Sequence, residues 1–335
     1  MSLPGICEKV AFLSQPAAYG RTACHVDIRE THISWIFLTE THAWKLKKPV
    51  CYEYLDFSTL EARRKDCEEE LRLNRRLARD VYLDIVPLTL DAAGRLALGD
   101  RGRPVDWLVH MRRLPSALML DRAIALQTWT EEDIRRLGNR LAFFYTEQAA
   151  RIPLAGAQYR IRLSEDLIDA GIELFHEGCG LPVGLINAAV GIARGQLEQD
   201  AALFERRAHS GRIVEGHGDL RPEHICLEPE PVIIDCLEFS AMMRQVDPVS
   251  ELAFLALECE RLGAPRAGEV VIETYCAATG DRPVPAVLDF YRRYHACVRA
   301  KIAVWHLRDS APPSFSKWTN RALQYLRYAA ALRAA

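Results

Sequence analysis

The segment from Val214 to Asp235 constrains the fold of this 335-residue chain more than any other. It places His-Gly-Asp-Leu, with its acid at Asp219, before two short apolar runs, 225–227 and 232–234, which a Glu-Pro-Glu-Pro turn separates. Two β-like runs on either side of a turn sequence predict a β-hairpin. Because a hairpin brings its ends together, we expect Asp219 and Asp235, which flank it, to lie close to one another.

The sequence changes character about one third of the way along the chain. Residues 24–50 and 82–111 contain short β-like runs, and residues 58–80 between them carry a helical apolar stripe behind a Ser-Thr cap. Beyond residue 115, helical spacing predicts helices at 131–149, 163–175, 185–207, 248–262, 267–279, 287–307 and 319–332. This pattern predicts an α+β fold with two lobes, a β-rich N-terminal lobe (1–111) with one long helix and a larger helical C-terminal lobe (112–335) that carries the hairpin.

Composition restricts the environment and the partners of the protein. The chain is 49% apolar and 26% charged, as is usual for globular proteins, and its net charge of −2 provides no general attraction to nucleic acid or anionic membranes. Ten cysteines, Cys179 among them, are scattered without a Cys-x-x-Cys pair, which favours reduced thiols. The first 20 residues lack the pattern of a signal peptide, and no apolar run approaches about 18 residues. We therefore expect a cytoplasmic protein without nucleic-acid or membrane partners.

The order His-Gly-Asp-Leu, strand, turn, strand, Ile-Asp resembles the aminoglycoside phosphotransferase-like branch of the protein-kinase-like fold. Within that branch the chain is most similar to an uncharacterised bacterial subgroup that is sometimes fused to a P-loop ATPase domain. The usual sequence in the branch is His-Gly-Asp-Leu-His-x-x-Asn followed by Ile-Asp-Phe/Trp-Glu. The resemblance implies a bilobal kinase-like fold and a kinase that moves the γ-phosphoryl group of ATP to a hydroxyl of a small molecule.

The resemblance also implies different roles for the two acids. Asp219 is the expected catalytic base, because a carboxylate within hydrogen-bond reach of the acceptor hydroxyl can orient it and take its proton. Asp235 is the expected Mg²⁺ ligand, because one or two protein carboxylates usually hold this ion together with nucleotide phosphates. Without the resemblance, the same residues would be a turn-stabilising Asp and an Asp at the end of a strand.

His224 is where the sequence departs from the branch, which usually has Asn at this place. Mg²⁺ prefers oxygen ligands, whereas an imidazole suits Mn²⁺ or a transition metal better. Three readings stay open: His224 ligates the metal, it orients Asp219, or the site is weakened. A zinc site built from His217, His224, Cys226 and Cys236 is a further alternative, although the spacing matches no compact structural zinc pattern.

The resemblance marks nucleotide-binding residues in the expected N-terminal lobe. Lys45 is similar to the kinase Lys that binds the ATP phosphates, and Glu70 is similar to the helix Glu that holds this Lys. Ala43, two residues before Lys45 on the same strand face, matches the residue under the adenine. Lys47 lies on that face as well and is the rival for the phosphate-binding role.

Two more segments match functional positions of the kinase-like fold. The stretch that begins at Met111 and includes Arg113 matches the hinge, whose backbone would bind adenine. Beyond Asp235, the residues Glu238, Arg244 and Asp247 match the segment after the metal ligand, where they could be structural or could orient the substrate.

Two functional hypotheses follow from these patterns. The first is an ATP- and divalent-metal-dependent kinase, whose acceptor the sequence does not identify, because a shared fold does not determine the substrate. The second, suggested by His224, is a weak or inactive kinase-like module that regulates a partner ATPase.

Overall fold

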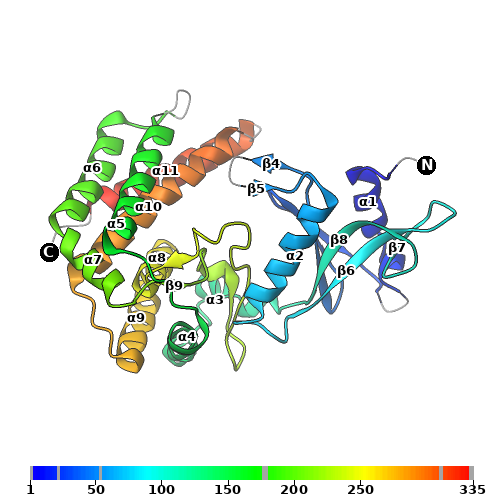
Figure 1. Ribbon diagram of the computed structural model, residues 1–335, viewed down its shortest axis with the longest axis horizontal. Helices are drawn as coiled ribbons and strands as arrows, with labels where there is room; N and C mark the ends of the chain where they lie inside the picture. The colour runs from blue at the N-terminus through cyan, green and yellow to red at the C-terminus, as the bar shows by residue number, and fades with distance from the viewer. Residues whose placement is uncertain (1–2, 21–22, 53–54, 176–179, 309–311, 332–335) are drawn as a thin grey trace. The chain divides into compact units, whose positions relative to one another are not determined.

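The computed structural model describes residues 3–20, 23–52, 55–175, 180–308 and 312–331 (Figure 1). The chain forms two compact units, of which the first combines 1–123 with 223–243 and the second combines 124–222 with 244–335. This division differs from the expected cut after residue 111, because the hairpin segment returns to the first unit.

The first unit is built on a six-stranded antiparallel sheet with strand order β1-β2-β3-β8-β6-β7. Its strands are β1 (Asp27–Glu30), β2 (Ser34–Leu38), β3 (His42–Lys47), β6 (Tyr82–Leu90), β7 (Leu96–Leu98) and β8 (Arg103–Arg112). The other elements of this unit are α1 (Ile6–Leu13), η1 (Pro16–Tyr19), β4 (Cys51–Tyr52), β5 (Leu55–Asp56), α2 (Leu60–Asn74), η2 (Ser116–Leu118), β10 (Ile225–Cys226) and β11 (Val232–Ile233). The short helix η4 (Pro222–His224) begins at the last residue of this part of the second unit and continues into the first. Helix α3 (Leu120–Leu126) spans the boundary between the units.

Each face of the sheet has its own apolar core. Leu46 and Leu108 belong to the core that also contains Leu13 of α1. Ala43 belongs to the other core, which contains Cys67 of α2, as well as Cys226 and Val232 of the hairpin. Strand residues alternate between the faces, so Ala43, Lys45 and Lys47 lie on the face that α2 and the hairpin cover, and Figure 1 shows α2 running along the sheet.

The second unit is helical, as the spacing of its apolar residues predicts. Its elements are α4 (Glu131–Phe143), η3 (Phe144–Gln148), α5 (Gly156–Leu174), α6 (Val183–Gln199), α7 (Ala201–His209), β9 (Val214–Glu215), β12 (Gln245–Val246), α8 (Pro248–Arg261), α9 (Pro265–Thr279), α10 (Pro285–Arg308) and α11 (Pro312–Ala331). The expected helix at 185–207 is two helices, because the chain leaves the helical conformation at Asp200, which ends α6 and precedes α7. The α+β prediction is confirmed.

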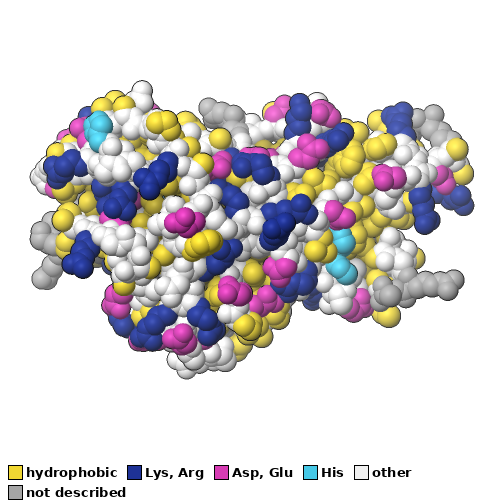
Figure 2. Space-filling model, turned by 60° about the horizontal axis from the view of Figure 1, so that its bottom comes forward, with side chains coloured by type: hydrophobic (Ala, Val, Ile, Leu, Met, Phe, Trp, Pro, Cys, Tyr) yellow, Lys and Arg dark blue, Asp and Glu magenta, His cyan; other side chains and the backbone are white. Residues whose placement is uncertain are grey.

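The surface and the cysteines match the composition. Figure 2 shows Lys and Arg interspersed with Asp and Glu on the face that it presents. The nine cysteines within the described ranges are free thiols, and Cys179 lies outside those ranges. Within the same ranges, no helix combines the length and the apolar character needed to cross a membrane.

Candidate functional site

The hairpin brings His224 and Asp235 together within the first unit. Ile225 pairs with Ile233 and Cys226 with Val232 in an antiparallel register, and the Ile234 amide donates to the His224 carbonyl at 2.9 Å. Nε2 of His224 then lies 3.5 Å from Oδ2 of Asp235. The predicted hairpin is confirmed. Asp219 belongs to the second unit, so the expected approach of Asp219 to Asp235 stays a prediction.

Asp235 has a left-handed backbone conformation with φ of 61°. Asp is one of the few residues besides Gly that adopt this conformation, at a cost of roughly 1–3 kcal/mol. Two hydrogen bonds hold the turn, since the Asp235 amide donates to the Tyr82 hydroxyl at 3.1 Å and the next amide, of Cys236, donates to Oδ1 of Asn74 at 2.9 Å. The Asp235 side chain stays 45% exposed and therefore accessible to a ligand.

Lys45 connects Asp235 to the sheet and to α2. Its Nζ lies 2.8 Å from Oδ1 of Asp235 and 2.9 Å from Oε1 of Glu70. Lys45 and Glu70 are both buried, and each lies beside a group of opposite charge, because a buried ion is costly without a partner. The structure thus contains the Lys45–Glu70 pair predicted from the sequence and adds Asp235 as its third member.

Lys47 occupies a different environment from Lys45. Its ammonium group is fully buried and lies 2.7 Å from Oε2 of Glu70, 2.6 Å from Oε1 of Glu238, and in contact with Asp66. All three partners are carboxylates, so Lys47 has no donor left over for a nucleotide. Of the two rival lysines, Lys45 is the one beside Asp235.

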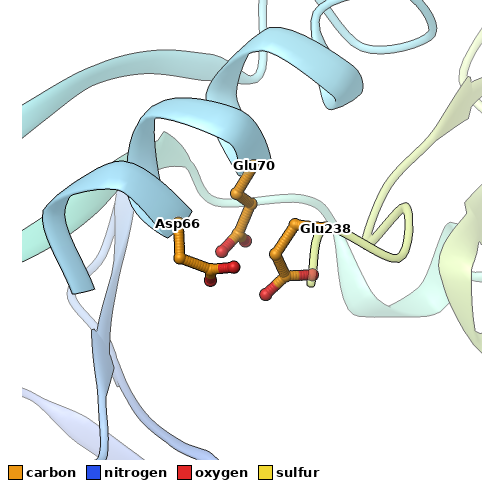
Figure 3. Close-up of side chains that lie close together, drawn as sticks. All are labelled: Asp66, Glu70 and Glu238. Carbon is orange, nitrogen blue, oxygen red and sulfur yellow. The ribbon is translucent and has the colours of Figure 1, made fainter. Parts of the chain in front are cut away.

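Asp66, Glu70 and Glu238 converge, as Figure 3 shows, with two acids on α2 and the third on the chain after the hairpin. Ligand atoms from all three lie within 4.8 Å of one another, which is an arrangement that could hold a metal ion. Lys47 contacts every member, so the cation that this cluster binds is the Lys47 ammonium group. Glu238 is therefore part of the first unit's buried ionic network.

The charges of this network keep its lysines protonated. Burial alone would lower the pKa of Lys45, but attraction to Asp235 and Glu70 outweighs burial and holds the pKa well above its usual value. The pKa of Lys47 is raised in the same way, since Glu238 and Glu70 overcome the effect of burial. Burial would raise the pKa of Glu238, but the two lysines lower it.

Asp66 gives the network a pH dependence. Burial raises its pKa from 3.8 to about 7, an effect that the attraction of Lys47 offsets only in part. The folded protein therefore takes up this proton at a higher pH than the unfolded chain, and the resulting stabilisation is lost as the pH rises through about 7. We expect the free energy of unfolding, measured with urea at several pH values from about 5 to about 8, to fall more in the wild type than in Asp66→Asn. Equal pH dependence of the two proteins would contradict this prediction.

The hinge residues are engaged within the first unit. Met111 pairs with Ala43 on one side and Tyr82 on the other. The Arg113 amide donates to the Thr41 carbonyl at 2.8 Å, and the Arg113 guanidinium group binds the Thr39 carbonyl. The Arg113 amide is thus not open to adenine, and the adenine-binding role of this stretch stays a prediction.

In the second unit, a buried carboxylate holds the backbone before Asp219. Glu251 of α8 accepts hydrogen bonds from the His217 amide at 2.9 Å and from the Gly218 amide, and it also accepts one from the Tyr145 hydroxyl at 2.6 Å. Gly218 has φ of 87°, a conformation that favours Gly. Glu251 therefore fixes the turn that presents Asp219.

The Asp219 carboxylate is accompanied by two arginines. Arg221 donates to Oδ2 of Asp219 from Nε at 3.0 Å and lies with Nη2 at 2.9 Å from the same atom. Nη1 of Arg299, on α10, lies 3.9 Å from Oδ1. The contact of Arg299 with Asp219 was not expected from the sequence, because the two residues are 80 positions apart, although Arg299 belongs to a basic stretch with Arg292 and Arg293.

The remaining residues of the segment after Asp235 have structural contacts in the second unit. Arg244 lies 3.0 Å from Glu215 and so links the strands β12 and β9, which are also paired through their backbones. Asp247 caps α8 by accepting from the Val249 amide at 3.0 Å and also binds Arg207. Both residues thus have structural contacts, and the role of orienting a substrate stays a prediction for them.

The zinc alternative finds no support in the first unit. Cys226 lies in its apolar core, and Cys236 lies 3.4 Å from the guanidinium group of Arg76. Among the described residues, the convergent group of possible metal ligands is the Lys47 cluster, which contains neither cysteine.

An antiparallel sheet with a Lys–Glu pair between a strand and a helix, followed by a helical unit with His-Gly-Asp, defines a protein-kinase-like fold. Solved structures confirm this fold. A choline/ethanolamine kinase family protein from Mesorhizobium loti matches with a TM-score of 0.58 and 15% identity over 97% of this chain and 95% of that chain. The GDP complex of aminoglycoside 2'-phosphotransferase-IIIa matches with a TM-score of 0.55 and 15% identity over 98% and 99%. Choline kinase from Cryptosporidium parvum has a TM-score of 0.51 and 9% identity over 96% and 93%.

Similar sequences come from mycobacteria. Uncharacterised proteins of Mycobacterium tuberculosis and Mycobacterium bovis are 31% identical over 314 residues, which is 91% of this chain and 60% of the relatives. The chain thus spans about three fifths of their length. No protein-family model matches the chain.

Proposed function

We propose that the protein is an ATP-dependent phosphotransferase that moves the γ-phosphoryl group to a hydroxyl of a small molecule. The observation that supports this most is the contact of Lys45 with both Glu70 and Asp235 in a kinase-like fold. Three solved neighbours are named as phosphotransferases or kinases, and one is a GDP complex. Phosphoryl transfer depends on positioned cations and carboxylates, and this unit supplies both.

Asp235 and His224 are the residues that would hold a divalent ion. Their facing atoms, 3.5 Å apart, approach the separation of about 3 Å between neighbouring ligands in an octahedron around Mg²⁺. A carboxylate with an imidazole suits Mn²⁺ as well as Mg²⁺. When bound, such an ion would neutralise part of the negative charge of the phosphates.

The other proposed roles belong to side chains that bind or take a proton. Lys45, which Asp235 and Glu70 keep charged, would bind phosphate oxygens. Asp235 would then leave its contact with Lys45 and bind the metal ion instead. Ala43, Met111 and Arg113 are proposed to lie by the adenine. Asp219, held by the turn that Glu251 fixes, would orient the acceptor hydroxyl and accept its proton.

A second candidate is a kinase-like module with little turnover that regulates a partner ATPase. His224 at the metal position supports it. Nucleotide binding with no phosphorylated product from any acceptor would favour this candidate.

Nucleotide titration monitored by thermal unfolding tests the proposed site. We expect ATP with Mg²⁺ or Mn²⁺ to raise the melting temperature on the order of 5 °C at saturating concentration, because a ligand that binds only the folded state stabilises it. Replacing the imidazole in His224→Asn should shift the preference from Mn²⁺ toward Mg²⁺. Asn also tolerates the left-handed conformation, so Asp235→Asn should fold normally. This variant should lose the metal-dependent part of the rise in melting temperature with Mg²⁺ and with Mn²⁺.

An unchanged melting temperature with every nucleotide and metal pair would argue against the phosphotransferase and favour a kinase-like module that binds no nucleotide. If binding is found, an ATP-consumption screen against small alcohols, amino alcohols, hydroxy acids and sugars should identify the acceptor.

A further inference from the structure

Two buried side chains bind the backbone of the turn at Asp235. The Tyr82 hydroxyl accepts a hydrogen bond from the Asp235 amide at 3.1 Å, and Oδ1 of Asn74 accepts one from the Cys236 amide at 2.9 Å. Tyr82 is the first residue of β6, Asn74 is the last residue of α2, and their exposed fractions are 1% and 0%. Two consecutive amides of this turn are therefore fixed, one to the sheet and the other to the helix.

The conformation of Asp235 depends on such support. Its φ of 61° lies in the left-handed region, which a residue other than Gly keeps only where the surrounding contacts favour it. In this conformation the carboxylate reaches Lys45, with Nζ at 2.8 Å from Oδ1. A change of φ to its ordinary negative values would turn the Cα–Cβ bond of Asp235 and carry the carboxylate away. The two backbone hydrogen bonds thus control where the carboxylate points.

Asn74 uses both ends of its side-chain amide. Its Nδ2 donates to the Glu70 carbonyl at 2.9 Å, one turn earlier on α2, while Oδ1 accepts from the Cys236 amide. Only this orientation of the amide suits both partners, because the carbonyl needs a donor and the backbone N–H needs an acceptor. The side chain of the same Glu70 binds Lys45, which in turn binds Asp235. Helix α2 therefore holds the turn of Asp235 and also the ammonium group that the carboxylate faces.

Tyr82 contributes a single neutral atom to the turn. Burial and the nearby charges of Glu70 and Asp235 raise the pKa of Tyr82 well above its usual value, so the hydroxyl stays protonated and accepts the Asp235 amide as a neutral group. The ring of Tyr82 belongs to the apolar core on this face of the sheet. The change Tyr82→Phe would therefore remove the hydrogen bond and keep the packing of the ring.

We propose that Tyr82 and Asn74 are positioning residues, which hold the Asp235 backbone in the conformation that directs its carboxylate to a cation. That cation is the Lys45 ammonium group in the structure and a divalent ion in the proposed reaction, so this inference rests on the proposed phosphotransferase function. Both residues act through Asp235. When a smaller fraction of the molecules has the competent conformation, the apparent dissociation constant of the ligand rises in proportion. Loss of either hydrogen bond should therefore weaken metal-dependent binding specifically.

Calorimetric titration of a non-hydrolysable ATP analogue tests this inference without an acceptor. The dissociation constant is measured once with EDTA and once with saturating Mn²⁺, and the ratio of the two values is the gain in nucleotide affinity that the metal provides. The proteins are the wild type, Tyr82→Phe and Asn74→Leu, with Asp235→Asn as the variant that should show no gain. The matched control is Tyr19→Phe, which removes a hydroxyl that donates to the Leu13 carbonyl at 2.6 Å beside the other core of the sheet.

Tyr82→Phe and Asn74→Leu should each reduce the gain about 3- to 10-fold, as expected for the loss of one hydrogen bond, and change the metal-free dissociation constant less than about twofold. Asn74→Asp, which keeps an oxygen for the Cys236 amide, should restore part of the loss. Tyr19→Phe should keep the gain of the wild type. A wild-type gain in Tyr82→Phe and Asn74→Leu, or equal weakening of binding with and without Mn²⁺, would overturn the inference, because a purely structural role does not act on the metal alone.

Amide hydrogen exchange separates failure of this inference from failure of the proposed function. If Mn²⁺ provides no gain in the wild type, the proposed metal site fails, and exchange in peptides that cover residues 234–238 is compared between the wild type and the same variants. Exchange at least about threefold faster in Tyr82→Phe and Asn74→Leu, but not in Tyr19→Phe, would keep the positioning of Asp235 and count against the phosphotransferase. Equal exchange in all four proteins would reject the positioning role as well.

Discussion

Asp219→Ala should lower kcat about 100- to 10,000-fold, the usual contribution of a positioned general base. The ATP-induced rise in melting temperature should stay close to that of the wild type, because the nucleotide-binding residues proposed here, Lys45, Glu70 and Asp235, all lie in the other unit. Formation of the phosphorylated product from the acceptor found by screening, together with thermal unfolding, measures both effects.

Two further variants make this result specific. Asp219→Asn keeps the size of the side chain and removes its ability to take a proton, so it should be nearly as inactive as Asp219→Ala. Asp200→Ala, at the junction of α6 and α7 where the side chain caps no amide, should retain activity. Wild-type turnover in both Asp219 variants would show that another group takes the proton.

Glu70→Ala should be the most destabilising single change in the first unit, with a loss of about 3–5 kcal/mol in the free energy of unfolding. The carboxylate is fully buried and binds Lys45 with one oxygen and Lys47 with the other, so its removal leaves two buried ammonium groups short of a partner. Denaturation by urea, followed by circular dichroism, measures the loss.

Glu68→Ala is the matched control on the same helix. Glu68 is half-exposed and pairs with Arg64 one turn earlier, an arrangement worth at most about 1 kcal/mol. Glu70→Gln tests the origin of the effect, since it keeps the volume but not the charge. Equal denaturation midpoints for Glu70→Ala and Glu68→Ala would mean that water or the other acids compensate for the lost carboxylate.

The hairpin and the Lys45–Glu70 pair could be predicted because their causes are local. A Glu-Pro-Glu-Pro turn between β-like runs allows few other structures, and Lys45 and Lys47 share a strand face at a separation of about 6.6 Å. Acids four residues apart on a helix rise by about 6 Å, so Asp66 and Glu70 match this spacing. The spacing therefore also indicates that Lys47, the rival of Lys45, can form a second ionic contact with the helix.

The contacts of Asp219 could not be predicted in the same way. Glu251 and Arg299 come from α8 and α10, and they reach the loop only because those helices pack in the second unit. Their neighbours in the sequence are ordinary helix residues, so no spacing identifies them. The hairpin likewise belongs to the first unit because Cys226 and Val232 pack against its sheet, whose strands come more than a hundred residues earlier in the chain.

The sequence by itself determined the α+β class, the hairpin and the residue types of the candidate site, because periodicity, turn residues and strand faces depend on neighbours along the chain. The tertiary structure decided which lysine contacts Asp235, which acids enclose Lys47 and which arginines accompany Asp219. These choices depend on side chains from distant segments, and buried charges allow only the arrangements in which each ion has a partner.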